Sequence, residues 1–138
     1  MATLDLEKLI EDWAEAWSSP DTQEKLLSLF TDTCVYEDLP LGVHAHGKAE
    51  LEQFYQRTHT NFPGFKYELT SLFVAGDRAG AEWVMTATFQ GDLPESSTNR
   101  NISVRGASAF ELQGNKLQRC SDYFDRATAL KQLGLLPA

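Results

Sequence analysis

A carboxylate between apolar neighbours near the end of the chain is the first feature whose residue types suggest chemistry. In the predicted strand Lys116–Asp125, alternation places Cys120, Asp122 and Phe124 on one face. If that face points inward, desolvation raises the pKa of Asp122 and makes it a competent general base. In the alternative interpretation, Asp122 faces solvent or caps the following helix. Asp125 stands directly before that helix, and we expect it to act as the helix cap.

A second candidate group lies in Val35-Tyr36-Glu37-Asp38-Leu39-Pro40. Tyr36 and Asp38 are two residues apart, so in a strand they share a face, while Glu37 points to the other side. A tyrosine hydroxyl and a carboxylate on one wall could orient a water molecule or a substrate hydroxyl. The residues are equally consistent with polar groups that meet solvent at the end of a strand.

Histidine and cysteine residues give weaker signals. His44 and His46 lie on one side of an extended segment, but no third ligand follows at a metal-binding spacing, so we expect no metal. They are interpreted as histidines at the rim of a pocket that hydrogen-bond a substrate, or as exposed loop residues. Cys34 and Cys120 lack a nearby base that would lower a thiol pKa, so buried packing thiols are expected.

Composition and charge exclude several classes of function. The chain has 138 residues, with 12 basic and 20 acidic side chains and a net charge of −8. No basic stripe is available to bind nucleic acid or an anionic membrane surface. The two cysteines form no disulfide framework and the N-terminus has no basic region typical of a signal peptide, so a reduced, cytoplasmic protein is expected.

Helical periodicity gives way to strand periodicity after Gly64, which predicts a single α+β domain over residues 1–138. The Asp21 and Glu24 pair resembles a capping arrangement that opens the second helix. The expected helices are Asp5–Ser18, Thr22–Phe30, a helix that begins after Gly47, and Arg126–Leu133. The expected strands are Thr33–Glu37, Phe65–Ala75, Ala81–Phe89, Asn101–Leu112 and Lys116–Asp125.

This order of elements, together with the ending Lys116–Asp125 and Ala129-Leu130-Lys131-Gln132-Leu133-Gly134-Leu135, resembles the nuclear transport factor 2-like superfamily and its SnoaL-like polyketide cyclase group. The resemblance covers Leu6 to Leu135. It implies a cone-shaped, curved antiparallel or mixed sheet wrapped around N-terminal helices, which encloses an apolar pocket. It also implies a homodimer without metal or cofactor. In the cyclases an aspartate on the last strands is the general base of an intramolecular aldol closure, and Asp122 matches that position.

The limonene epoxide hydrolase branch is similar in its Asp-Tyr-Phe-Asp ending. Its water-holding tyrosine is matched by Tyr36, whereas Asp38 stands where that branch has asparagine. The aspartate and arginine that the branch carries on a middle strand would fall at Trp83 and Met85. Neither side chain can relay a proton or bind an epoxide oxygen, which argues against epoxide hydrolysis by that relay.

The same comparison predicts which side chains bind substrate. We expect Gly106 to leave room on one wall and Trp83 to offer a flat face, which suits a planar or polycyclic apolar ligand. Plain core packing is the alternative for these residues. The full predicted set is Trp83, Met85, Ala87, Val104, Gly106, Ser108, Phe124, His44 and His46.

The expected function is that of a cofactor-independent enzyme of the polyketide cyclase or isomerase type, which acts on an apolar, cyclic carbonyl compound. Asp122, Tyr36 and Asp38 are the candidate catalytic residues, and the two carboxyls should titrate in separate steps, with Asp122 holding the proton. The alternatives are a non-catalytic binding protein for an apolar metabolite, a subunit that associates through its sheet, and an enzyme that adds water to an epoxide. Dimerisation should use the outer face of Asn101–Leu112, including Arg105 and Ala107.

Overall fold

The computed structural model describes residues 3–90 and 99–137, which form four helices and six strands. In chain order these are α1 Thr3–Trp17, α2 Gln23–Ser28, β1 Phe30–Asp38, β2 Val43–His46, α3 Gly47–Asn61, β3 Lys66–Ala75, β4 Arg78–Phe89, β5 Arg100–Gln113, β6 Lys116–Phe124 and α4 Arg126–Gln132.

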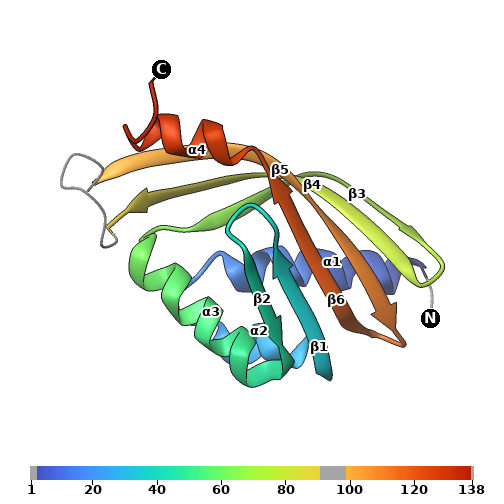
Figure 1. The fold of residues 1–138 in the computed structure, drawn as a ribbon. Helices are drawn as coiled ribbons and strands as arrows, with labels where there is room; N and C mark the ends of the chain where they lie inside the picture. Colours follow the sequence, from blue (N-terminus) through green and yellow to red (C-terminus); the bar gives the residue numbers. More distant parts are fainter. Residues whose placement is uncertain (1–2, 91–98, 138) are drawn as a thin grey trace.

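All six strands belong to one curved sheet with the order β2-β1-β6-β5-β4-β3. Neighbouring strands are antiparallel except β1 and β6, which run parallel and join the N-terminal part of the chain to the last strand. The helices α1 and α3 lie within the curve of the sheet, and α4 runs along the β5 end (Figure 1). The sheet is open, with β2 and β3 as its edges, so the expected cone arises from curvature and not from closure into a barrel.

Alternation along the strands builds the inner wall, as the sequence predicts. On β4 every second side chain from Ala81 to Phe89 is buried, and Trp83 is only 1% exposed. The indoles of α1 fill the space opposite this wall. Trp13 stacks on Tyr67 with ring centroids 4.8 Å apart, and Trp17 meets Tyr36 at 5.6 Å. Such aromatic contacts bury large apolar areas and fix how far the helix stands from the sheet.

The boundaries near β1 differ from the sequence prediction. The second helix is shorter than expected, and Thr22 precedes it without a side-chain capping bond, because its hydroxyl donates to the Ala16 carbonyl at 2.5 Å. The predicted Asp21–Glu24 capping arrangement is therefore wrong. Released from the helix, Phe30 begins β1 and pairs with Leu117 of β6. Strand β2 was not expected, and its four residues form the edge beside β1.

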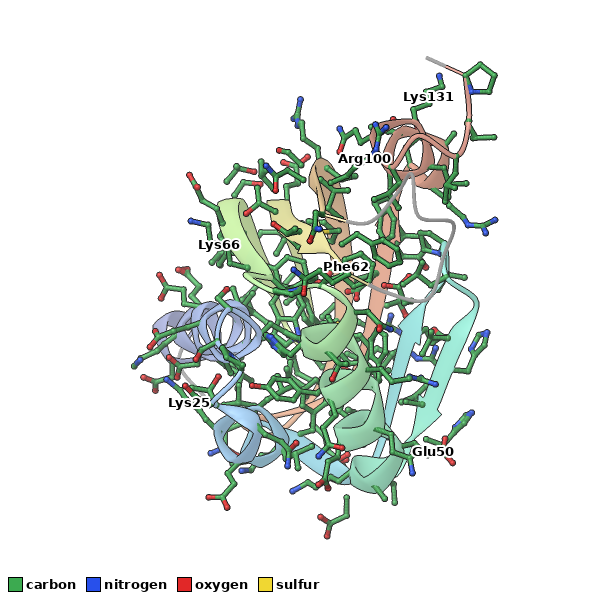
Figure 2. The ribbon with its side chains drawn as sticks, turned by 90° about the vertical axis from the view of Figure 1, so that its left-hand side faces the viewer. Lys25, Glu50, Phe62, Lys66, Arg100 and Lys131 are labelled. Carbon is green, nitrogen blue, oxygen red and sulfur yellow. The ribbon has the colours of Figure 1, made fainter. Side chains whose placement is uncertain are left out.

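Helix α4 follows β6 directly and begins as the sequence predicts. The Asp125 carboxylate accepts hydrogen bonds from the Ala127 amide at 3.0 Å and the Thr128 hydroxyl at 2.8 Å, so it caps the helix. Figure 2 shows Phe62 at the end of α3, and Lys131 of α4 near Arg100 of β5. None of the helices in the described ranges is long and apolar enough to cross a membrane.

Candidate functional site

Two buried carboxyl groups lie side by side where β1 and β6 run parallel. Asp38 is the register partner of Asp122, and the two residues are 5% and 1% exposed. Register partners on neighbouring strands project their side chains from the same face of a sheet. The structure therefore brings together the two candidate aspartates, which are separated by more than eighty residues of sequence.

Hydrogen bonds fix the orientation of the Asp122 carboxyl. The Trp83 indole N–H donates to the Ser108 hydroxyl oxygen at 2.9 Å, and the Ser108 hydroxyl donates to Oδ1 of Asp122 at 2.6 Å. Because an indole nitrogen can only donate, this chain leaves the serine proton free to point at the carboxylate. The Cys120 thiol also donates to Oδ1, at 3.5 Å. This arrangement favours a negative charge on Asp122.

The second oxygen of Asp122, Oδ2, is buried without a hydrogen-bond partner, and so is the Tyr36 hydroxyl. The Tyr36 and Tyr67 hydroxyls nevertheless stand near enough to Asp122 to hold its pKa down. In return, burial first and the Asp122 charge second raise the pKa of both tyrosines well above its usual range. Both tyrosines therefore stay protonated and can donate a hydrogen bond at this point.

Burial raises the pKa of both aspartates. For Asp122 the pKa rises to about 6, since the hydrogen bonds from Ser108 and its neighbours oppose the cost of burial. For Asp38 it rises to about 7, because burial and the Asp122 charge are opposed only by the Leu41 amide, which donates to Oδ1 at 3.1 Å. More hydrogen-bond donors stabilise the charged form of Asp122 than of Asp38. When the pair holds one proton, that proton therefore lies on Asp38, whereas the sequence suggests Asp122.

An apolar cavity of about 200 Å³ lies next to this pair, and Asp38 is the member of the pair that lines it. Apolar side chains from α1, α3, β4, β5 and α4 form most of the wall, and Tyr67 of β3 is the only tyrosine in it. The lining residues are Trp17, Asp38, Leu41, Phe54, Thr58, Phe62, Phe65, Tyr67, Trp83, Met85, Phe89, Ile102, Phe124, Arg126, Ala129, Leu130 and Leu133. The composition suits an apolar ligand with one polar group at Asp38.

The structure places the nine predicted substrate-binding residues differently. Trp83, Met85 and Phe124 line the cavity. Ala87, Val104, Gly106 and Ser108 do not belong to its lining, although Ala87, Val104 and Ser108 are buried. His44 and His46 are exposed, because Ala45 is the residue that β2 turns inward, and His44 instead faces Glu37 at 3.4 Å. We therefore do not include the two histidines in the proposed site.

Gly106 makes room for a side chain and not for a ligand. A methyl group at Gly106 would lie 2.4 Å from Cη2 of Trp83 and 2.6 Å from the Tyr123 carbonyl oxygen. The Trp83 ring therefore lies directly over the glycine backbone, which lets the indole N–H reach Ser108. The role of Gly106 is to position Trp83, and through it the hydrogen bonds of Asp122.

Sequence reasoning did not identify Tyr67 and Arg126 as residues of the cavity. Alternation in the predicted strand Phe65–Ala75 would have placed Tyr67 on the inner face with Leu69. The sequence gives no sign that Tyr67 lies near the carboxyl pair, because the strands that carry the two aspartates are distant from it in sequence. Nothing in the sequence identifies Arg126 as a cavity residue, since its place depends on how α4 docks.

No cluster of three or more histidine, cysteine or acidic residues suited to hold a metal ion occurs within residues 3–90 and 99–137. The site offers two carboxyl groups with raised pKa values, hydroxyl donors and an apolar wall. That donor set is suited to moving protons on an uncharged organic molecule.

Comparison with solved structures identifies the fold. A protein from Jannaschia sp. CCS1 that is named as a SnoaL-like polyketide cyclase superposes with a TM-score of 0.84 at 14% identity, over 98% of this chain and 95% of that one. A protein with a ketosteroid isomerase-like fold from Catenulispora acidiphila gives 0.82 at 22% identity, over 94% of each chain. An epoxide hydrolase of the limonene epoxide hydrolase type from M. tuberculosis gives 0.77 at 17% identity, over 95% and 90%.

These likenesses establish the nuclear transport factor 2-like fold, which is also the ketosteroid isomerase-like fold. No curated protein matches the sequence significantly. The sequence model of the SnoaL-like domain matches residues 10–120, which includes Asp38 and ends two residues before Asp122. With most of its length matched in this way, the chain belongs to the SnoaL-like domain family.

Proposed function

We propose that this chain is a cofactor-independent enzyme of the cyclase or isomerase type, which removes a proton from the carbon next to a carbonyl group in an apolar cyclic compound. The observation that carries the proposal is the buried Asp38–Asp122 pair at the wall of an apolar cavity. A general base is most effective when its pKa lies near the working pH, and burial raises the pKa of Asp38 to about 7.

Asp38 is the base in this proposal, because it lines the cavity and Asp122 does not. The ionised carboxylate of Asp38 takes the proton from the carbon acid, and the electron pair of the broken C–H bond moves onto the carbonyl oxygen as an enolate. Tyr67 lines the same cavity, and burial keeps its hydroxyl protonated, so it is the proposed donor to that oxygen. Asp122 acts as a positioning residue whose charge keeps the pKa of Asp38 high.

The fate of the enolate decides the reaction class. In an isomerisation, Asp38 returns its proton to another carbon of the same conjugated system. In a cyclisation, the enolate carbon attacks a second carbonyl carbon of the same molecule, and the proton on Asp38 passes to the new alkoxide. Both reactions need only the substrate and the acid–base pair, and both suit a water-poor cavity.

The relatives support this class without deciding it. The names of the solved structures include a polyketide cyclase and an epoxide hydrolase, and one fold commonly carries many chemistries. Addition of water to an epoxide is disfavoured by Trp83 and Met85, which are apolar walls of this cavity. A non-catalytic binding protein for an apolar metabolite remains the competing function that the experiment must separate.

Deuterium exchange of 2-tetralone, a bicyclic ketone with acidic protons next to its carbonyl, tests the proposal. In buffered D2O, mass spectrometry should detect faster exchange with the protein present than without it. Asp38→Asn should slow the catalysed rate by about 100-fold or more. The control is Asp32→Asn, which replaces an exposed aspartate on the same strand and should keep the wild-type rate. If wild-type protein binds 2-tetralone without accelerating exchange, it is a binding protein and the catalytic proposal is wrong.

A further inference from the structure

Among the described residues that line the cavity, Arg126 is the one lysine or arginine. It is the first residue of α4, and its side chain is exposed to solvent while also contributing to the cavity wall. Its side chain makes no hydrogen bond or ion pair with any other residue in the described ranges. The guanidinium carries five N–H donors, and no acceptor among the described residues takes them, so they can bind a ligand group at the cavity.

The charge of Arg126 is separated from the carboxyl pair. The described residues show no ion pair between it and Asp38, and burial, the Asp122 charge and the Leu41 amide are what act on the pKa of Asp38. Arg126 therefore does not neutralise the acid across the cavity. The wall carries the Asp38 carboxyl and the Arg126 cation as two charged groups that are not paired with each other.

The other cations near α4 lie toward its far end. Lys131 is in the last turn of the helix, and the Arg100 guanidinium packs within about 3.0 Å of where a Gly134 side chain would begin (Figure 2). Beside Arg126 itself stands the Asp125 carboxylate, which caps the helix. The positive charge in the cavity wall is therefore that of Arg126, and a cation in the wall of an apolar cavity favours binding of an anion.

We infer that the substrate is an apolar carbonyl compound that also carries a carboxylate or another anionic group, and that Arg126 binds this group while Asp38 meets the carbonyl end. This inference rests on the proposed function and names the substrate class of the same cavity. A planar guanidinium matches a carboxylate with two parallel hydrogen bonds, which would set the orientation of the ligand. Arg126 is then a specificity-determining residue that decides which carbon lies against Asp38.

The competing explanation is that Arg126 only packs its methylene stem against the cavity wall and leaves its charge in water. Substitution by methionine separates the two explanations, because it keeps an unbranched stem and removes the charge. Arg105→Met is the matched control, since Arg105 is exposed on the outer face of β5, away from the cavity.

The experiment measures the affinity of 2-naphthoate and of its neutral analogue 2-naphthamide by isothermal titration calorimetry at pH 6, where the naphthoate is ionised. Wild-type protein should bind the naphthoate at least fivefold more tightly than the amide. Arg126→Met should weaken naphthoate binding about tenfold and change amide binding less than twofold. Arg105→Met should keep the wild-type preference, and Arg126→Lys should keep part of it.

Equal affinity for the two probes, a naphthoate that does not bind, or a preference that survives Arg126→Met would overturn the inference. A preference lost equally in Arg105→Met would also overturn it, because the effect would then reflect net charge alone. These outcomes are distinct from failure of the proposed function, which is measured with the neutral ketone 2-tetralone. If the protein prefers 2-naphthoate but does not exchange the protons of 2-tetralone, Arg126 still binds anions and only the proposed catalysis is wrong.

Discussion

Asp38 of β1 and Asp122 of β6 are paired residues in the only parallel ladder of the described sheet. The pairing places one acid against the cavity and the other behind it, where Ser108, Cys120 and the two tyrosines surround it. Two carboxyls held this close in a buried site do not both ionise easily. The pair therefore acts as one unit that holds a proton near neutral pH.

The stability of the protein should depend on pH through Asp38. Its pKa is raised from the ordinary 3.8 to about 7, so the folded protein binds this proton more tightly than the unfolded chain does. The stabilisation that Asp38 contributes is therefore fully present below about pH 4 and is lost as the pH rises through about 7. The amide in Asp38→Asn cannot titrate. When the pH rises from 4.5 to 8, the free energy of unfolding of this variant should therefore gain on the order of 3 kcal/mol relative to that of the wild type.

Urea denaturation of both proteins at the two pH values measures this gain. Taking the difference between variants at each pH cancels the titration of the carboxyls that do not interact with Asp38, so the gain reports the Asp38–Asp122 pair. Asp32→Asn is the control, since Asp32 is exposed and should show no such gain. An Asp38→Asn difference that is the same at pH 4.5 and pH 8 would show that Asp38 titrates normally.

Ser108 should matter to both partners of its hydrogen bonds. Ser108→Ala removes the donor to Asp122 and leaves the buried Trp83 indole N–H without an acceptor. We expect a loss of about 1–3 kcal/mol in stability and a further rise in the pKa of Asp122. Ser103→Ala, on the exposed face of the same strand, should be close to neutral. Equal effects of the two substitutions in thermal unfolding and carboxyl titration would contradict this role.

Ligand binding should be visible in tryptophan fluorescence. Trp17 and Trp83 line the cavity, whereas Trp13 is not part of its lining. The change in emission that 2-tetralone produces should shrink in Trp17→Phe and again in Trp83→Phe, and Trp13→Phe should keep it. A response that disappears only in Trp13→Phe would show that the ligand binds elsewhere.

We propose that two copies associate through the outer face of the sheet, as the sequence suggested. On this face Tyr123 is 51% exposed, and Arg105 and Ala107 lie on the neighbouring strand β5. Light scattering at micromolar concentration should give about twice the chain mass of 15.5 kDa, and Tyr123→Asp should reduce it to one chain. Gln53→Asp on α3 is the control. A wild-type particle of 15.5 kDa would exclude this dimer.

Periodicity allowed much of the fold to be predicted, because strand alternation and the helical stripe are local properties. The alternation of Trp83 and Met85 predicted the inner face of β4, and the capping role of Asp125 followed from its position before the helix. The start of β1 at Phe30 could not be predicted, since it depends on pairing with Leu117 almost ninety residues away.

The site could be predicted only where the alternation of side chains along a strand decides which face a residue lies on. Alternation placed Asp122 with Cys120, and Asp38 with Tyr36, on shared faces, and the structure shows that all four are buried. The pairing of β1 with β6 in one register, and hence which acid lines the cavity, follows from tertiary structure. The same holds for Tyr67 and Arg126, and for Gly106, whose space is taken by the Trp83 ring.

A carbon-detected NMR titration of the aspartate carboxyl groups tests the shared proton of Asp38 and Asp122 directly, with Asp38→Asn and Asp122→Asn used to assign the two signals. Both carboxyls should titrate well above the ordinary aspartate value of 3.8, in two separate steps. Each substitution should also shift the titration of the remaining partner. Two independent titrations near 3.8 would contradict the proton-sharing pair and, with it, the proposed acid–base chemistry.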